Sequence, residues 1–236
     1  MVTESDADIL RRGAAIWGLS LDDTALARFE KLAELLIEAN TRVNLTRVAP
    51  KDIVSLHFLD SLSIAAAVPL QVGMGLIDVG TGGGFPGLPL AIAYPEMHVT
   101  MVDGTRKKLD FIDAVIADLG ITNAVTVHAR AEDLAKRNEY RVGFDIAAAR
   151  AVARLPQLAR WLLPLVKPTG AAVAYKGRDV STELNELRES MGRLEDPIYK
   201  VTEVTIPFTE IVRTLVVMKS PAHAVAGRSH VRGISK

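Results

Sequence analysis

The chain has 236 residues, 49% of them hydrophobic and 24% charged, so it can bury a core of its own without disulfides or metals. Its 28 basic and 28 acidic residues balance and it has no cysteine, which excludes a globally basic protein, a disulfide framework, a zinc ribbon and a cysteine nucleophile. The N-terminus lacks a signal-peptide pattern and no stretch reaches the roughly 20 apolar residues of a membrane span, so we expect a cytoplasmic protein without a membrane partner.

The first 70 residues are predicted to be helical. A helix is expected over residues 20–39, opened by a Ser20-x-x-Asp23 capping pattern, because apolar residues recur there at helical spacing. These are Leu26, Phe29, Leu32, Ala33 and Leu36. A second helix is expected to start near Pro50 and to end before Pro69. We therefore expect residues 1–70 to form a helical segment packed on the core.

Strands and helices are predicted to alternate from Gly75 onward. The apolar runs at 76–79, 99–102, 125–127, 145–148 and 171–175 read as strands, and those at 87–94, 106–119, 131–138, 156–166 and 180–194 as helices. This alternation is typical of a doubly wound, mostly parallel sheet. Two further runs, 199–206 and 213–218, leave no room for a helix between them and indicate an antiparallel edge hairpin. We therefore predict an α/β domain with a seven-stranded sheet over residues 71–220, followed by a basic flexible tail over 221–236.

The strongest signal is a glycine-rich run directly after the first of these strands. It reads Asp78-Val79-Gly80-Thr81-Gly82-Gly83-Gly84-Phe85-Pro86-Gly87. Glycines belong where a chain turns tightly and lets a ligand touch its backbone. Gly82-x-Gly84-x-x-Gly87 also matches the dinucleotide fingerprint, but that match alone is weak, and the glycine that closes the strand is Gly80.

The charge of Asp78 separates the two cofactor classes. A carboxylate at the mouth of the loop would repel a pyrophosphate but favour the sulfonium and ammonium groups of S-adenosyl-L-methionine. Asp103 ends the second strand and is placed for a contact to both ribose hydroxyls, a role that either class would use. We therefore expect S-adenosyl-L-methionine as the cofactor and no bound metal.

Two further positions belong to the same rim. Glu132 follows the third strand, where it could address an adenine, although taken alone it reads as a charge at a helix N-terminus. Arg150 lies just past the fourth strand, at the carboxyl edge where open α/β sheets bind ligands, and its other interpretation is a surface arginine.

Five segments together suggest a family. They are Asn44-Leu45-Thr46, His57-Phe58-Leu59-Asp60-Ser61, the run from Asp78 to Leu90, Arg150-Ala151 and Lys176-Gly177. In this order they closely resemble the bacterial ribosomal RNA small subunit methyltransferase G family, also called glucose-inhibited division protein B. The resemblance covers residues 20–219 and departs from the family at Leu56, where the family often has a basic residue.

This resemblance implies a Rossmann-like, class I S-adenosyl-L-methionine-dependent methyltransferase. Its substrate would be N7 of one guanine, position 527 in the 530 loop of 16S ribosomal RNA, in the small ribosomal subunit, and we expect it to act as a monomer. By motif, the resemblance implies a cofactor site made of Gly80, Phe85, Asp103, Gly104, Thr105, Ala131, Glu132 and Arg150, to which the loop adds Asp78, Gly82 and Gly84.

No catalytic residue is assigned from the sequence. His57, Asp60 and Lys176 are candidates for positioning the substrate. His57 and Asp60, three apart on one helix face, could form a hydrogen-bonded pair near the substrate or only lock the helix against the sheet. Guanine N7 carries a lone pair and no proton at neutral pH, so methyl transfer there requires no general base.

Three other functions stay open. The loop says little about the acceptor, so another RNA or a small molecule could be the substrate. The chain could also be a ribosome-assembly factor that binds RNA without turnover or, least in keeping with the loop, a nicotinamide-dependent oxidoreductase. Two basic groups could contact RNA or form solvated surface; they are Arg106, Lys107 and Lys108, and Arg228, Arg232 and Lys236 of the tail.

Overall fold

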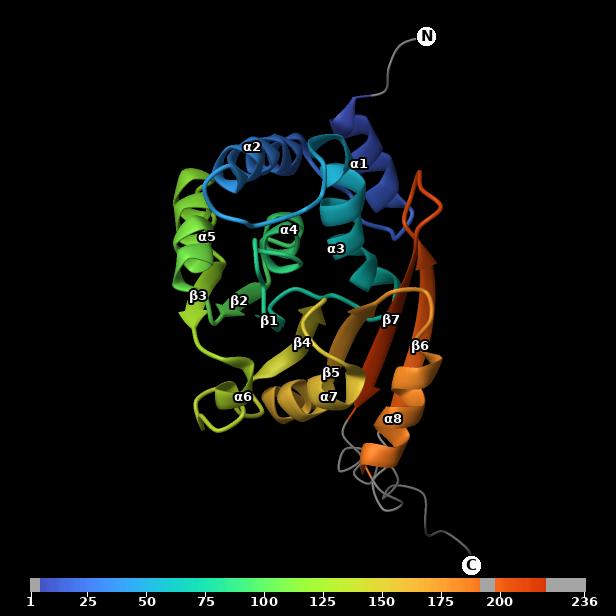
Figure 1. Ribbon diagram of the computed structural model, residues 1–236. Coiled ribbons are helices and arrows are strands. Elements are labelled where there is room, and N and C mark those ends of the chain that lie inside the picture. Colours follow the sequence, from blue (N-terminus) through green and yellow to red (C-terminus); the bar gives the residue numbers. More distant parts are fainter. Residues whose placement is uncertain (1–4, 192–197, 220–236) are drawn as a thin grey trace, which may run out of the picture.

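A computed structural model of the chain describes residues 5–191 and 198–219 (Figure 1). Seven strands form one sheet in the order β3-β2-β1-β4-β5-β7-β6. They are β1 (Gly75–Val79), β2 (His98–Asp103), β3 (Ala124–His128), β4 (Phe144–Arg150), β5 (Val166–Lys176), β6 (Ile198–Thr205) and β7 (Val212–Lys219). Strands β1 to β5 are parallel, whereas β7 pairs antiparallel with both β5 and β6. The predicted mostly parallel sheet with an antiparallel edge hairpin is confirmed.

The strand order reverses between β1 and β4. From β1 the chain first adds β2 and β3 on one side, and then returns to add β4 and β5 on the other. At such a switch point the connections after neighbouring strands diverge, which opens a crevice at the carboxyl ends of β1 and β4. The glycine-rich loop after β1 lies at this point.

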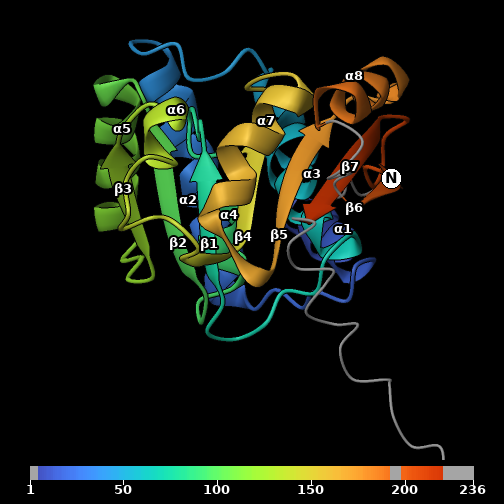
Figure 2. The ribbon, with the colours of Figure 1, turned by 90° about the horizontal axis from the view of Figure 1, so that it is seen from below.

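Helices cover both faces of the sheet (Figures 1 and 2). One face carries α1 (Asp6–Ala15), α2 (Asp23–Asn40), α3 (Asp60–Leu62), α4 (Gly87–Ala93) and α5 (Arg106–Asp118). The other carries α6 (Ala131–Leu134), α7 (Leu155–Leu162), which continues into η4 (Leu163–Leu165), and α8 (Ser181–Met191). Because side chains alternate along a strand, Ile146 and Ala148 join the core under the first set of helices, and Ala147 and Ala149 join the core under the second.

The segment between Pro50 and Ala66 is helical, as expected, but it is not one regular helix. It consists of η1 (Pro50–Asp52), η2 (Val54–Leu59), α3 and η3 (Ser63–Ala66). The element η2 is a π-helix, whose wider turn places one extra residue in the helix. His57 lies in this wide turn and Asp60 directly follows it, so both candidate substrate-positioning residues lie at an irregular point of the helix.

The capping residue predicted for the start of α2 is wrong. Asp22, not Ser20, is the N-cap, because the Asp22 carboxylate accepts a hydrogen bond of 2.7 Å from the backbone N–H of Ala25. The helix then buries Leu26, Phe29, Leu32 and Leu36. The amphipathic pattern was therefore interpreted correctly, and only the cap was misplaced.

Two predicted helices on the other face are too long. The helix expected over 131–138 ends at Leu134, after which the backbone hydrogen bonds join residues three apart. The helix expected over 156–166 ends at Leu162, because Pro164 has no N–H to continue it, and β5 begins at Val166. The predicted basic tail lies outside the described residues. Within 5–191 and 198–219, no helix has the length and apolar character that crossing a membrane would require.

Candidate active site

The glycine-rich loop encloses the carboxyl group of Asp78. Asp78 Oδ2 accepts hydrogen bonds from the Thr81 hydroxyl (2.6 Å) and from the backbone N–H of Gly87 (2.8 Å). The expectation that this carboxylate stands at the mouth of the loop is wrong, because both donors belong to the loop and hold the carboxylate beneath it, fully buried. Burial raises the pKa of Asp78 to about 6. Its second oxygen, Oδ1, is a buried acceptor without a donor among the described residues.

Gly80 is the position of the loop that most requires glycine. Its φ is +75°, a conformation that other residues rarely adopt, and a Cβ placed there would lie 2.7 Å from Cγ2 of Val152. Val152 follows β4, so this contact brings the connections after β1 and β4 together at the switch point. The backbone of Gly80 thereby becomes part of the wall of a cavity.

Asp103 joins the loop after β1 to the end of β2. Its Oδ2 accepts from the backbone N–H of Gly82 (3.0 Å), and its Oδ1 accepts from the backbone N–H of Thr105 (2.8 Å). The carboxylate is therefore already oriented by two backbone donors. It lines the same cavity.

This cavity has a volume of about 510 Å³ and is lined by residues from the ends of β1, β2, β3 and β4 and from α7. Six of the predicted cofactor-site residues line it: Gly80, Asp103, Gly104, Thr105, Ala131 and Glu132. Five others were not predicted: Ala129, Arg130, Val152, Gln157 and Trp161. Gln157 and Trp161 are four residues apart and so face the cavity from one side of α7. This spacing in the sequence could have indicated that the two side chains lie together.

The other predicted site residues lie outside the lining of this cavity. Gly84 has a φ of +93°, and a side chain at this position would clash with Leu88 of α4. Gly84 therefore allows α4 to pack closely against the loop. Gly82 takes part through its N–H bond to Asp103. Phe85 is buried and stacks on the His57 ring, with centroids 4.2 Å apart and an interplanar angle of 10°. Phe85 therefore connects the glycine-rich loop to the helical segment.

Asp60 is the centre of a second polar group, which we call the Asp60 cluster: Asp60, His57, Arg150 and Arg213. The Asp60 side chain is 1% exposed and accepts from Arg150 Nη1 (2.8 Å), from Arg213 Nε (2.6 Å) and from Arg213 Nη2 (3.0 Å). His57 and Asp60 are thus not bonded to each other; Arg150 bridges them, since its Nη2 lies 3.0 Å from His57 Nδ1. Arg213 was not predicted, because its partner is 153 residues away in the sequence.

The hydrogen bonds of His57 define its protonation state. A guanidinium can only donate, so Nδ1 of His57 accepts from Arg150 and carries no proton. The proton therefore resides on Nε2, which lies 2.6 Å from the hydroxyl of Thr46. Burial, aided by the Arg150 charge, lowers the pKa of His57 to about 3. His57 is neutral at physiological pH and has no free lone pair to accept a substrate proton.

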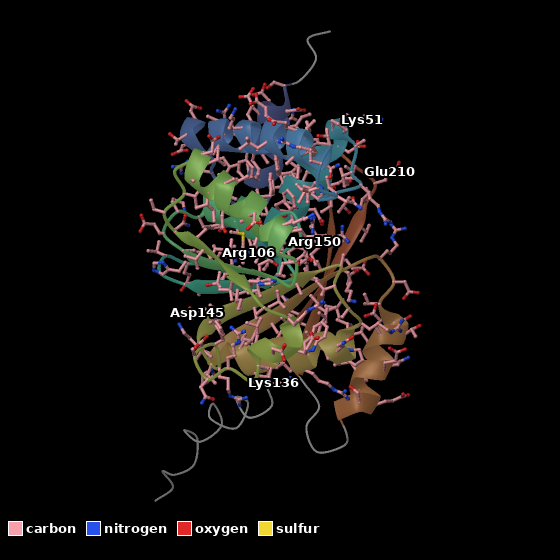
Figure 3. The ribbon with its side chains drawn as sticks, turned by 60° about the vertical axis from the view of Figure 1, so that its left-hand side comes forward. Lys51, Arg106, Lys136, Asp145, Arg150 and Glu210 are labelled. Carbon is pink, nitrogen blue, oxygen red and sulfur yellow. The ribbon has the colours of Figure 1, made fainter. Side chains whose placement is uncertain are left out.

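Strand alternation explains why Arg150 joins this cluster. Arg150 lies two residues after Ala148 and so projects from the same face of the sheet, toward the N-terminal helices (Figure 3). Its guanidinium also lies 5.3 Å from the centre of the Phe85 ring. Arg150 thus lies against the glycine-rich loop but outside the cavity lining.

Lys176 projects from the opposite face. Its Nζ donates to the backbone carbonyl of Ala153 (2.7 Å) and pairs with Glu183 of α8 (2.7 Å). Glu183 also accepts from the backbone N–H of Leu155. The side chain of Lys176 is therefore tied to the connection after β4, which carries Val152, and not to His57 or Asp60. Only the backbone of Lys176 meets the Asp60 cluster, where its carbonyl accepts from Arg213 Nη1 (3.2 Å).

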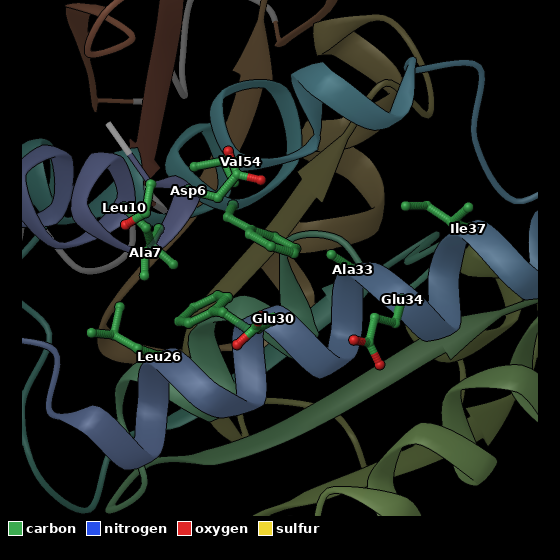
Figure 4. A pocket seen from close by; sticks show the side chains of 12 residues that line it. Asp6, Ala7, Leu10, Leu26, Glu30, Ala33, Glu34, Ile37 and Val54 are labelled. Atoms are coloured by element: carbon green, nitrogen blue, oxygen red, sulfur yellow. The ribbon is translucent and has the colours of Figure 1, made fainter. Parts of the chain in front are cut away.

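A separate cavity of about 420 Å³ lies between α1, α2 and η2 (Figure 4). Its floor is apolar and includes Phe29 and Phe58, and its rim carries Asp6, Glu30 and Glu34. It contains none of the residues predicted for the cofactor site.

The basic run at the start of α5 was predicted either to contact RNA or to form solvated surface. One of its members, Arg106, pairs with Asp110 (3.0 Å).

Comparisons with known proteins converge on one family. The sequence profile of the family described as rRNA small subunit methyltransferase G matches residues 25–212. The ribosomal RNA small subunit methyltransferase G of Thermoanaerobacter sp. is 38% identical over 213 residues, which cover 90% of this chain and 89% of that protein. The protein of the same name from Gloeobacter violaceus is 44% identical over 199 residues, covering 84% and 79%.

Solved structures show the same fold at lower identity. The crystal structure of a SAM dependent methyltransferase from Aquifex aeolicus aligns with a TM-score of 0.51 and 18% identity, over 73% of this chain and 99% of that one. This similarity confirms the predicted Rossmann-like α/β architecture.

Proposed function

The chain belongs to the rRNA small subunit methyltransferase G family, and on that basis we propose that it transfers a methyl group from S-adenosyl-L-methionine to N7 of a single guanine of 16S ribosomal RNA, position 527 in the 530 loop. The observation that carries the proposal is the family match over residues 25–212, which includes every residue lining the cavity at the switch point. We propose that the protein acts as a monomer on the small ribosomal subunit.

The residues around the cavity fit the proposed cofactor. Asp103 offers an oriented carboxylate for the ribose hydroxyls, and the Trp161 side chain contributes apolar surface for an adenine. Asp78 contributes negative charge beneath the loop, and its unpaired Oδ1 is the kind of buried acceptor that a cationic ligand group satisfies. Glu132 and Arg130 complete the wall. The Asp78 carboxylate beneath the loop would repel a pyrophosphate bound there, so the charge of the loop favours S-adenosyl-L-methionine over a dinucleotide.

The arrangement suits methylation of a nitrogen that carries no proton. S-adenosyl-L-methionine, when bound, supplies an electrophilic methyl group. Guanine N7 would accept that methyl group with its own lone pair as the methyl C–S bond of the donor breaks and S-adenosylhomocysteine leaves. The protein therefore has to align the base and exclude water rather than remove a proton. His57 cannot act as a base because Arg150 occupies its Nδ1. We propose that the Asp60 cluster holds η2 and the end of β4 in the geometry that positions the guanine.

The acceptor must present its N7 edge openly. In an RNA helix the major groove is deep and narrow, which hides N7 from side chains. We therefore propose that the target guanine lies in a loop or is splayed out of its stack, and that the same guanine in a duplex is refused.

The pH dependence of methylation tests this mechanism. With cofactor saturating, the single-turnover rate should be flat from pH 6 to 9, because the pKa of His57 lies near 3 and no base is needed. With cofactor limiting, the rate should fall below about pH 6, as protonation of Asp78 removes the charge that favours the cofactor. Rapid-quench measurements with an RNA loop fragment, and with its duplex form as a negative control, give both profiles.

Two variants identify the group whose protonation causes the fall in rate below about pH 6. Asp78→Asn should abolish this fall, whereas His57→Gln should lower the rate and leave the shape of the profile intact. A fall that persists at saturating cofactor and disappears in His57→Gln would make His57 a proton acceptor and contradict the base-free mechanism.

A further inference from the structure

Phe208 is an exposed aromatic residue held in an unusual backbone conformation. It lies in the turn between β6 and β7, the residue is 51% exposed, and its φ is +63°. For a bulky residue this is a strained conformation, whereas asparagine adopts it readily. Neither the burial nor the backbone of this turn explains a phenylalanine here.

The turn itself is well ordered by hydrogen bonds. The N–H of Ile206 donates to the carbonyl of Ile211 (2.8 Å), which closes the turn, and the Thr209 hydroxyl donates to the carbonyl of Ile206 (2.9 Å). The backbone N–H of Ile211 in turn donates to the Thr209 hydroxyl (3.1 Å). The ring of Phe208 is therefore presented from a fixed backbone.

The turn lies at the edge of the sheet where the candidate active site lies. Lys176, the last residue of β5, pairs with Thr214 of β7, so residues 206–211 project beyond the carboxyl end of β5. Arg213, from the same hairpin, binds Asp60. Strands are spaced about 4.8 Å apart, which puts β7 roughly 10 Å from β4 and Arg150. Phe208 lies five residues before Arg213, which adds up to about 17 Å along the hairpin. The ring can therefore reach a base a few nucleotides away from one held near the Asp60 cluster.

The surroundings of the ring favour a nucleobase over a phosphate. Arg12 belongs to α1, which flanks the hairpin (Figure 1). Its guanidinium carbon lies 5.0 Å from the centroid of the Phe208 ring. Stacking aromatic rings with an adjacent arginine is a recurrent way of holding unpaired bases. Glu210, two residues further on, lies at the periphery in Figure 3 and would repel a phosphate, so the attraction at this tip resides in the ring.

We propose that Phe208 stacks on an unpaired base a few nucleotides from the target guanine and so helps to hold the single strand that presents this guanine to the active site. This inference rests on the proposed function, since it requires a single-stranded RNA substrate. It predicts that Phe208 contributes to RNA binding and leaves cofactor binding unchanged.

Three substitutions test the role of the ring. Phe208→Asn suits the positive φ and should fold at least as stably as the wild type, yet bind an RNA loop fragment about 5- to 150-fold more weakly, as for one lost base–aromatic stack. Phe208→Leu keeps an apolar side chain without the ring and should lose nearly as much affinity. Phe208→Tyr should stay within about twofold of wild type. The affinities come from fluorescence anisotropy with labelled RNA, and KM should rise while kcat changes little.

The controls separate this inference from the proposed function. Affinity for S-adenosylhomocysteine, measured by calorimetry, should be the same in all four proteins. If the wild type methylates the RNA but Phe208→Asn binds it with unchanged affinity, stacking by Phe208 is wrong and the proposed function stands. If Phe208→Leu retains wild-type RNA affinity, the side chain meets an apolar surface such as a protein, and the inference is equally overturned. If the wild type does not methylate RNA at all, the proposed function itself fails.

Discussion

Asp60→Ala should lower the free energy of unfolding by about 3–5 kcal/mol, as expected when one partner of a buried ion pair is removed. The Asp60 carboxylate accepts hydrogen bonds from the guanidinium groups of both Arg150 and Arg213. Its removal leaves two guanidinium groups facing each other in a largely buried site. Urea unfolding, followed by circular dichroism, measures the change.

A charge-free variant distinguishes the loss of the ion pairs from the loss of packing. Asp60→Leu combined with Arg150→Met and Arg213→Met removes every charge in the cluster at similar volume, and should recover at least half of the stability lost in Asp60→Ala. It should nevertheless methylate more slowly than the wild type, because the contact of Arg150 to His57 is lost as well. A decrease below about 1 kcal/mol for Asp60→Ala would mean that the cluster does not hold the helical segment on the sheet.

Asp103→Ala should weaken binding of S-adenosyl-L-methionine by about 10- to 150-fold, corresponding to roughly 1.5–3 kcal/mol for hydrogen bonds to a charged group. The carboxylate is preoriented at the cavity by Gly82 and Thr105, so its contribution to binding does not require it to be ordered first. Isothermal titration calorimetry with S-adenosylhomocysteine and with the methyl donor gives the affinities.

Asp110→Ala is the matched control for that variant. Asp110 also lies near the start of α5, but it is exposed, pairs with Arg106 and does not line the cavity. It should leave cofactor affinity within about twofold. Equal affinities for Asp103→Ala and wild type would remove Asp103 from the cofactor site.

The sheet was predictable because its signals are local. Each parallel strand is an apolar run followed by a turn or a helix, and the last two runs are too close together for a crossover. Two of the N-terminal helical stretches, over Asp23–Asn40 and Pro50–Ala66, were predicted by period, whereas helix α1 (Asp6–Ala15) was not assigned. The π-helix over Val54–Leu59 was not predicted either, because a single inserted residue leaves the apolar pattern almost unchanged. Helix ends decided by one side-chain cap, such as Asp22, were likewise misplaced.

The cofactor cavity was more predictable than the Asp60 cluster because its signals, too, are local in the sequence. Residues that directly follow a strand, such as Gly80, Asp103 and Glu132, reach the cavity by their place in the chain. The face from which a side chain projects depends on strand parity, and counting it from Ala148 would have directed Arg150 toward the N-terminal helices. Arg213 could not be found in this way, because nothing local to the sequence indicates its pairing with Asp60.

Identifying the methylated atom tests the proposed reaction directly. Small ribosomal subunits from a strain lacking this methyltransferase would be incubated with the purified protein and S-adenosyl-L-methionine carrying a deuterated methyl group, and the 16S RNA digested to nucleosides and oligonucleotides for mass spectrometry. We expect one labelled 7-methylguanosine per RNA, in the oligonucleotide of the 530 loop, and much less label with Asp103→Ala at low cofactor concentration. Label on another base, on another atom of guanine, or on no RNA at all would contradict the proposed reaction.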